Sequence, residues 1–167
     1  MSRLLYFLFF ASIMFTIPSC SKEEDGNKEE QTDPPKPDDP EKPEYPTFDK
    51  PSWTVDDKTF EYSMTAIVQL PDSLSSTEKQ DDVLAVFKGK ECRGIGERIH
   101  ISDKKYVWMI MIYGDKADEE LYFMYYSNNN KHKYKSSSTL TFSNDSKLGT
   151  VDNPAVLPMV IITDKDG

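Results

Sequence analysis

The stretch FEYSMTAIVQL, residues 60–70, decides the fold of this chain. Its even positions, from Phe60 to Leu70, are all apolar or aromatic, and its odd positions are polar except Ile67. A period of two puts each set of side chains on its own face, so this pattern predicts a β-strand with one buried face. Pro71 ends the strand, because proline has no backbone N–H to donate to a neighbouring strand.

Further short apolar runs follow this strand. Residues 106–113 are apolar on both faces, which predicts a central strand that is covered on each side. Gly94 and Gly96 predict a bulge or a close backbone approach, and Pro158 predicts an edge strand or a bulge. The expected strands are residues 60–70, 83–87, 91–101, 106–113, 121–126, 131–135, 139–142 and 156–163, with a polar loop at 72–82.

These elements indicate the fold class. About eight short strands with no convincing amphipathic helix are typical of an antiparallel sandwich or barrel. We expect an all-β domain at residues 51–167, folded as an antiparallel two-sheet β-sandwich.

The composition changes upstream of this domain. Residues 21–47 hold six of the eleven prolines and almost no apolar side chains, so they bury too little surface to offset the entropy cost of ordering. Residues 22–50 carry eleven acidic residues and five lysines, and much of the net charge of −9 lies there. We expect a disordered tether at residues 20–50. No basic face is present for nucleic acid, and no basic cluster for anionic lipid.

The N-terminus has the layout of a secretory signal peptide at residues 1–19. Arg3 supplies a positive start, residues 4–17 form an apolar run, and the small residue Ser19 precedes Cys20. The run is too short and wrongly flanked for a membrane-spanning helix. The cysteine resembles the lipobox of bacterial lipoproteins, and the acidic residues 22–25 resemble the export signal of Bacteroidetes surface lipoproteins. The resemblance implies that Cys20 is lipidated and anchors the chain in the outer membrane, facing the cell exterior.

A second resemblance covers the domain. The stretch DDVLAVFKGKECRG, residues 81–94, is similar to a segment of β-sandwich domains in Bacteroidetes surface and secreted proteins, and residues 111–114 and 149–154 also fit. The resemblance implies a β-sandwich. It adds no catalytic residue, because that family carries no established reaction.

The same stretch is typical of a polar hairpin. Asp82 precedes its first strand, and Glu91 and Arg93 share one face of its second strand. Arg93 could pair with Glu91 or with Asp82. We expect these three residues to form a structural polar cluster, and the alternative is a ligand contact at the loop end of the domain.

Catalytic and metal-binding patterns are weak. His100 and His132 lie in no metal-ligand spacing, and Cys92 has no evident histidine partner. Acidic residues at 115, 118 and 119 could bind calcium, but a solvated turn is the simpler interpretation. We therefore expect a non-enzymatic protein without metal or cofactor.

Aromatic side chains give the better functional hypothesis. Tyrosine and tryptophan combine an apolar ring with a polar group and are favoured on binding surfaces. Tyr122, Tyr126 and Tyr134 lie beside polar loops, and we expect them to contact a ligand. The leading hypothesis is a non-catalytic module that binds polysaccharide; the alternative is a structural or adhesive subunit that contacts other surface proteins. The aromatic residues that exceed the needs of a small core are Trp53, Tyr106, Trp108, Tyr113, Tyr122, Tyr125, Tyr126 and Tyr134.

Overall fold

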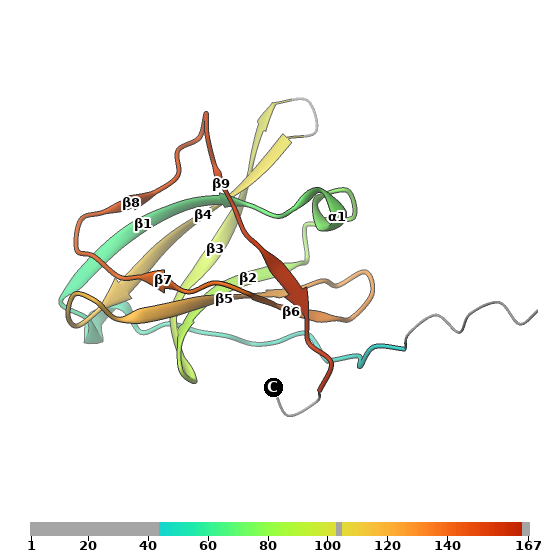
Figure 1. Ribbon diagram of the computed structural model, residues 1–167, viewed down its shortest axis with the longest axis horizontal. Helices are drawn as coiled ribbons and strands as arrows, with labels where there is room; N and C mark the ends of the chain where they lie inside the picture. The colour runs from blue at the N-terminus through green and yellow to red at the C-terminus, as the bar shows by residue number, and fades with distance from the viewer. Residues whose placement is uncertain (1–43, 103–104, 165–167) are drawn as a thin grey trace, which may run out of the picture. The chain divides into compact units, whose positions relative to one another are not determined.

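The computed structural model describes residues 44–102 and 105–164, which belong to the compact unit Lys42–Gly167 (Figure 1). This part of the chain is nearly all-β, as predicted. Cys20, the expected signal peptide and most of the expected tether lie outside the described residues. The elements are η1 (Asp57–Thr59), β1 (Tyr62–Gln69), α1 (Asp72–Ser75), β2 (Val83–Lys88), β3 (Glu91–Ser102), β4 (Lys105–Gly114), β5 (Glu120–Tyr126), β6 (Lys133–Ser136), β7 (Leu140–Thr141), β8 (Lys147–Leu148), β9 (Ala155–Val156) and β10 (Met159–Ile161).

One curled sheet contains all of these strands. Its main path is β10-β6-β5-β2-β3-β4-β1-β8, with β7 paired to β5 and β9 paired to β1. The long strand β3 joins two halves, because residues 91–95 pair with β2 and residues 96–102 pair with β4. Figure 1 shows β1 and β4 on one side and β5 and β6 on the other. The main core, with Trp108 and Ile110 from one half and Phe123 and Tyr125 from the other, packs between them.

The pairing is mixed, whereas we expected an antiparallel arrangement. β8 and β9 run parallel to β1, with Thr65 opposite Lys147 and Val68 opposite Ala155. The reason is the route of the chain after β7. It reaches the start of β1, where the N–H of Asp145 donates to the carbonyl of Ser63 at 2.9 Å, and then follows the free edge of β1 in the same direction.

The two faces of β4 differ in burial. Ile110 lies opposite Ala66 of β1, and both side chains are fully buried in the core. Met109 and Met111 alternate with these positions and remain 41% and 46% exposed. The strand is central in the sheet, as predicted, but the prediction that both of its faces are covered is wrong at Met109 and Met111, although Val107 on the same face is buried. Apolar side chains on one face of a strand do not guarantee that another part of the chain packs on that face.

A β-bulge in the β2–β3 hairpin turns one side chain inward. Val86 pairs with Gly94 and Phe87 pairs with Cys92, so Arg93 is an extra residue in β3. Such a residue re-aims its side chain relative to the regular alternation. Arg93 is accordingly only 1% exposed. The predicted irregularity near Gly94 is therefore present.

Two glycines allow this hairpin. Gly89 has φ +57° in the turn, a conformation that costs a glycine little. A Cβ added to Gly94 would lie against the carbonyl oxygen of Met111. The close approach of β3 to β4 thus requires glycine at this position.

Three regions differ from the sequence-based expectation. The polar loop after β1 begins with the short helix α1, and β8 lies in a region where no strand was expected. The expected strand at 156–163 is divided into β9 and β10 around Pro158. β10 is an edge strand of the sheet, in agreement with the proline prediction.

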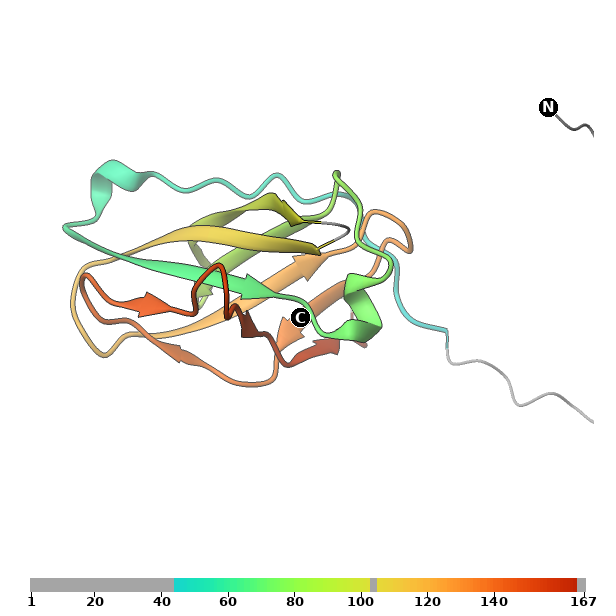
Figure 2. The ribbon, with the colours of Figure 1, turned by 90° about the horizontal axis from the view of Figure 1, so that it is seen from above.

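The N-terminal segment, residues 44–60, lies along the outer surface of the β2 and β5 half of the sheet (Figure 2). The ring of Trp53 packs edge-on against Phe87, with 5.2 Å between centroids. The N–H of Phe48 donates to the carbonyl of Lys131 at 2.8 Å. Residues 44–50, which the composition groups with the tether, therefore contact the domain. Besides the core between the two halves, a smaller hydrophobic cluster of Ala85, Phe87 and Met124 lies beneath this segment. Since both clusters lie within residues 42–167, we expect this unit to fold on its own.

Candidate functional site

The three tyrosines predicted to contact a ligand do not share an exposed surface. Tyr126 is fully buried, and Tyr134 is 8% exposed, with its ring 5.8 Å from that of Tyr125. Tyr122 is half-buried, and its hydroxyl donates to the carbonyl of Gly89. Two of the three rings belong to the inside of the domain, so they form no platform on which a sugar could stack.

The predicted polar cluster is divided between two places. Arg93 pairs with Glu91 at 2.9 Å, which was one of its two predicted partners. Asp82 lies elsewhere and contacts neither residue by hydrogen bond or ion pair. The strand register explains the separation, because Arg93 lies beside Val86 and Phe87 near the end of β2, whereas Asp82 precedes the start of that strand.

Arg93 is the centre of a buried ion network. Its guanidinium lies 3.4 Å from Asp115 and 3.6 Å from Glu119, and it covers the ring of Phe60 at 4.4 Å. Lys88 pairs with Glu119 from the other side. Burial alone would raise the pKa of the Glu119 carboxyl, but the Lys88 hydrogen bond and the Arg93 charge outweigh it and lower that pKa. Glu91 and Asp115 are more than half exposed, and Nε of Arg93 and Oε2 of Glu119 have no hydrogen-bond partner among the described residues. The network joins β2 and β3 to the turn between β4 and β5.

Asp82 organises a second buried polar group. Its Oδ2 accepts the hydroxyl of Tyr125 at 2.6 Å and the N–H of Lys79 at 2.7 Å. Its Oδ1 accepts the N–H of Asn128 at 2.7 Å. Burial, followed by the hydrogen bond and charge of Asp82, raises the pKa of Tyr125. This carboxylate therefore joins the loop before β2 to the turn after β5.

The sequence singled out few groups for catalysis, and the structure places them apart. Cys92 is half-buried, and burial raises the pKa of its thiol. The ring of His132 lies against the carbonyl of Pro46, and the ring of His100 lies 4.9 Å from that of Tyr106. Among residues 44–102 and 105–164, no group of three metal-ligating side chains comes together. The same residues contain no helix long and apolar enough to cross a bilayer.

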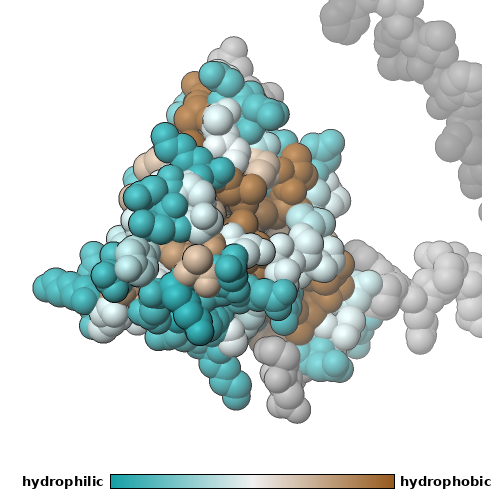
Figure 3. All heavy atoms as spheres, turned by 60° about the vertical axis from the view of Figure 1, so that its left-hand side comes forward, coloured by the Kyte–Doolittle hydropathy of each residue, from teal (hydrophilic) through white to brown (hydrophobic). Residues whose placement is uncertain are grey.

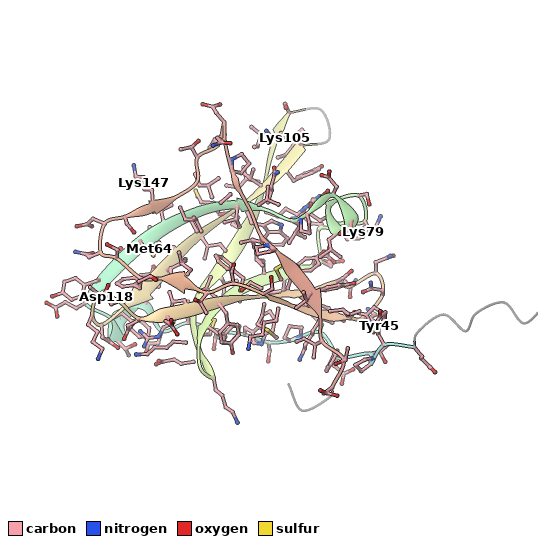
Figure 4. The ribbon with its side chains drawn as sticks, in the orientation of Figure 1. Tyr45, Met64, Lys79, Lys105, Asp118 and Lys147 are labelled. Atoms are coloured by element: carbon pink, nitrogen blue, oxygen red, sulfur yellow. The ribbon has the colours of Figure 1, made fainter. Side chains whose placement is uncertain are left out.

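An open cleft lies between α1 and the start of β4. Its volume is about 300 Å³. In Figure 4, Lys79, which follows α1, and Lys105 of β4 lie toward the same end of the domain, and Asp118 lies at the other end. Most of the side chains that line the cleft are polar and carry amide, hydroxyl, carboxylate or ammonium groups. The lining also includes one aromatic ring and one leucine. These residues are Gln69, Leu70, Asp72, Ser75, Ser76, Glu78, Lys105 and Tyr106.

Glu78 is the buried acid of this cleft. Its Oε1 accepts the indole N–H of Trp108 at 2.5 Å and lies 3.8 Å from Nε of Arg98. The Arg98 guanidinium covers the ring of Tyr106 at 3.4 Å, and its buried Nε has no hydrogen-bond partner among the described residues. Burial raises the pKa of Glu78, against the opposing effects of Trp108 and Arg98, and nearby Asp82 raises it further. A perturbed acid beside a cleft is a frequent property of binding sites.

Sequence reasoning did not find this site. Glu78 belongs to a polar loop with no recurring pattern, and Arg98 occupies an inward position on an irregular strand. Tyr106 was one of the surplus aromatic residues, but nothing local distinguished it from the others. The cleft joins α1 to β4, about thirty residues apart, and only the fold brings them together.

The chain was compared with protein-family models, with curated proteins and with solved structures, and it matches none of them.

Proposed function

We propose that this chain is a lipid-anchored surface lipoprotein whose domain is a non-catalytic module that binds a saccharide in the α1 cleft. The anchor follows from the N-terminal sequence and Cys20, with the chain in the outer membrane and facing the cell exterior. The tether upstream of residue 42 would separate the domain from the lipid.

The composition of the cleft is the observation that supports a saccharide best. Sugar hydroxyls need donors and acceptors close together, and Gln69, Asp72 and Glu78 supply amide and carboxylate groups. Tyr106, one face of which is covered by Arg98, supplies apolar ring surface at the side of the cleft for sugar C–H groups. A volume of about 300 Å³ lies at the lower end for small-ligand sites and suits one sugar unit of a longer chain.

The test is affinity electrophoresis of residues 42–167 against a panel of polysaccharides. We expect retardation by one glycan class and its loss in Tyr106→Ala. A second variant, Ser75→Trp, fills the cleft from an exposed position and should abolish retardation without removing a buried group. Tyr113→Ala is the matched control, because Tyr113 lies on the same strand outside the cleft. Retardation that persists in both cleft variants would contradict the proposal, as would a panel without any retardation.

The anchor has its own test. Cys20→Ala should abolish palmitate labelling and move the protein from the membrane fraction to the soluble fraction. A variant that still labels with palmitate would contradict the lipoprotein proposal. Protease treatment of intact cells, with the wild-type chain, distinguishes the outer face of the membrane from the periplasmic face.

A second candidate function is contact with another protein, as a structural or adhesive subunit. The exposed Met109 and Met111 favour it, because soluble monomers rarely expose large apolar patches without a partner. Figure 3 shows apolar side chains gathered in patches on one face of the domain, with hydrophilic side chains along its lower margin.

We also propose that the fold is a two-layer β-sandwich. The core between the β1–β4 half and the β2–β5–β6 half is what a two-layer β-sandwich requires. In this proposal, β3 belongs to both layers, and the parallel strands β8 and β9 are additions at one edge.

A further inference from the structure

Most of the apolar side chains that the domain exposes lie together. Of the six large apolar side chains exposed among the described residues, Ile95, Met109, Met111 and Val156 belong to one surface. Their exposed fractions are 37%, 41%, 46% and 55%. Strand register and alternation place all four on the outer face of β3, β4 and β9, and we call them the outer patch.

The neighbours of the two methionines on the same outer face come from β1 and β3. Met109 lies opposite Ile67 on β1 and opposite Glu97 on β3, and Met111 lies opposite Thr65. Side chains at opposed positions are about 5 Å apart, close enough to form one surface. A hollow of about 270 Å³ adjoins Met111 and is lined by residues of β1 and of the segment that leads into β8. It could receive a protruding side chain.

The other half of the same outer surface is already covered by the chain itself. Phe87 of β2 is 7% exposed because the N-terminal segment carries Trp53 onto it. That segment continues past Phe60 into β1. Met109 and Met111 stay open to solvent all the same, so within the described part of the chain the outer patch has no equivalent cover.

The margins of the patch carry opposite charges. Lys147 of β8 is exposed beside Thr65 on one side, and Glu97 of β3 is exposed beside Met109 on the other. A two-fold axis in the interface, parallel to the strands, places each edge of one sheet over the opposite edge of its copy. Lys147 of one copy then faces the margin that holds Glu97 of the other copy. Met109 and Met111 of one copy pack against the same residues of the other copy.

We propose that a second copy of this chain covers the outer patch, giving a face-to-face homodimer. Two sheets that pack in this way keep their strands within about 30° of each other, and two-fold dimers use the same patch on both subunits. The proposal rests on the second candidate function, protein contact, and supplies its partner. The outer patch borders the α1 cleft where Val156 pairs with Gln69, but Met111 does not line the cleft, so a failure of glycan binding and a failure of dimerisation are distinguishable by variants.

Sedimentation equilibrium of residues 42–167 over a wide concentration range tests the proposal. The wild type should form a dimer, and Met111→Glu should raise the dissociation constant at least about tenfold, because it puts an unpaired charge in the middle of the interface. Val160→Glu is the matched control. Val160 is also an exposed apolar residue, 51% exposed, but it lies on β10 and should leave the dimer intact.

Charge exchange tests the orientation. Glu97→Lys and Lys147→Glu should each weaken the dimer by about twofold to fivefold, and the double variant should restore it. Circular dichroism confirms that these surface variants stay folded. A wild-type unit that remains monomeric at every concentration overturns the proposal, and so does a dimer that tolerates Met111→Glu. A chain from residue 21 that is monomeric while residues 42–167 dimerise would show that the N-terminal residues cover the patch instead.

Discussion

The indole N–H of Trp108 donates a 2.5 Å hydrogen bond to Oε1 of Glu78 and thereby joins the core strand β4 to the loop after α1. Trp108 is 2% exposed, so its N–H has no access to water. The same carboxylate lies 3.8 Å from Arg98. Glu78 therefore holds the wall of the cleft in place as well as lining it.

Removal of this acceptor should destabilise the domain. Glu78→Ala leaves the buried indole N–H unpaired, and we expect the free energy of unfolding to fall by about 2 kcal/mol. Glu78→Gln keeps an acceptor and should lose less. Urea denaturation measures both. Glu120→Ala, an exposed glutamate of β5, is the control and should change little.

The raised pKa of Glu78 predicts a dependence of stability on pH. Because its folded-state pKa lies above the ordinary value of 4.5, folding favours the protonated acid. The stabilisation is complete below 4.5 and is lost as pH rises through the folded-state value. Glu78→Gln should remove this component from the curve of unfolding free energy against pH. An unchanged curve would contradict the burial of this carboxyl.

Glu119 predicts the opposite dependence. Its folded-state pKa is lower than 4.5, so its contribution to stability is present above 4.5 and is lost as pH falls through the lowered value. Glu119→Ala leaves Arg93 with less compensation and should cost about 3 kcal/mol at pH 7. At a pH well below the lowered pKa the variant and the wild type should differ less. Denaturant titrations at several pH values, with Glu120→Ala as the control, test this.

Neighbouring aspartates provide a matched pair. Asp82 is 6% exposed and accepts three hydrogen bonds, whereas Asp81 is exposed. We expect Asp82→Ala to lower the free energy of unfolding by about 3 kcal/mol, because a buried hydroxyl and two backbone N–H groups lose a charged acceptor. Asp81→Ala should change it by less than about 0.5 kcal/mol. Similar losses in the two variants would contradict the network around Asp82.

Cys92 should react slowly with thiol reagents. Burial raises its pKa above the ordinary value of 9.0, so less than about one thiol in a hundred is ionised at pH 7. The rate of alkylation by iodoacetamide should stay low in the native domain and rise on unfolding in urea. A native rate equal to or above the unfolded rate would mark Cys92 as an activated nucleophile.

Local sequence patterns gave the strands that bury one face. The alternation at residues 60–70 predicted β1, and apolar runs predicted β2, β4 and β5 within one or two residues of their observed ends. The glycines of β3 predicted its irregularity, because a missing Cβ allows the close approach to Met111. These features depend on residues that are close in sequence, so the alternation of apolar and polar side chains is enough to predict them.

The same patterns could not distinguish the tyrosines. Tyr122 and Tyr126 occupy one strand beside similar loops, yet one is half-buried and the other is fully buried. Both rings lie on the face of β5 that points away from the main core, and Tyr126 lies beside residues 47–50 of the N-terminal segment, which the strand pattern does not reveal. Likewise, the register between β2 and β3 puts Arg93 and Asp82 at opposite ends of β2, and the sequence alone did not reveal it.

The sequence by itself therefore determined an all-β domain, its strand positions and the acidic, proline-rich composition that precedes it, since these follow from side-chain periodicity and local backbone restrictions. The tertiary structure decided the parallel edge strands, the α1 cleft around Glu78 and Tyr106, and the open outer face at Met109 and Met111. Each of these joins residues distant in sequence, and burial and pairing at such distances depend on how the sheet curls.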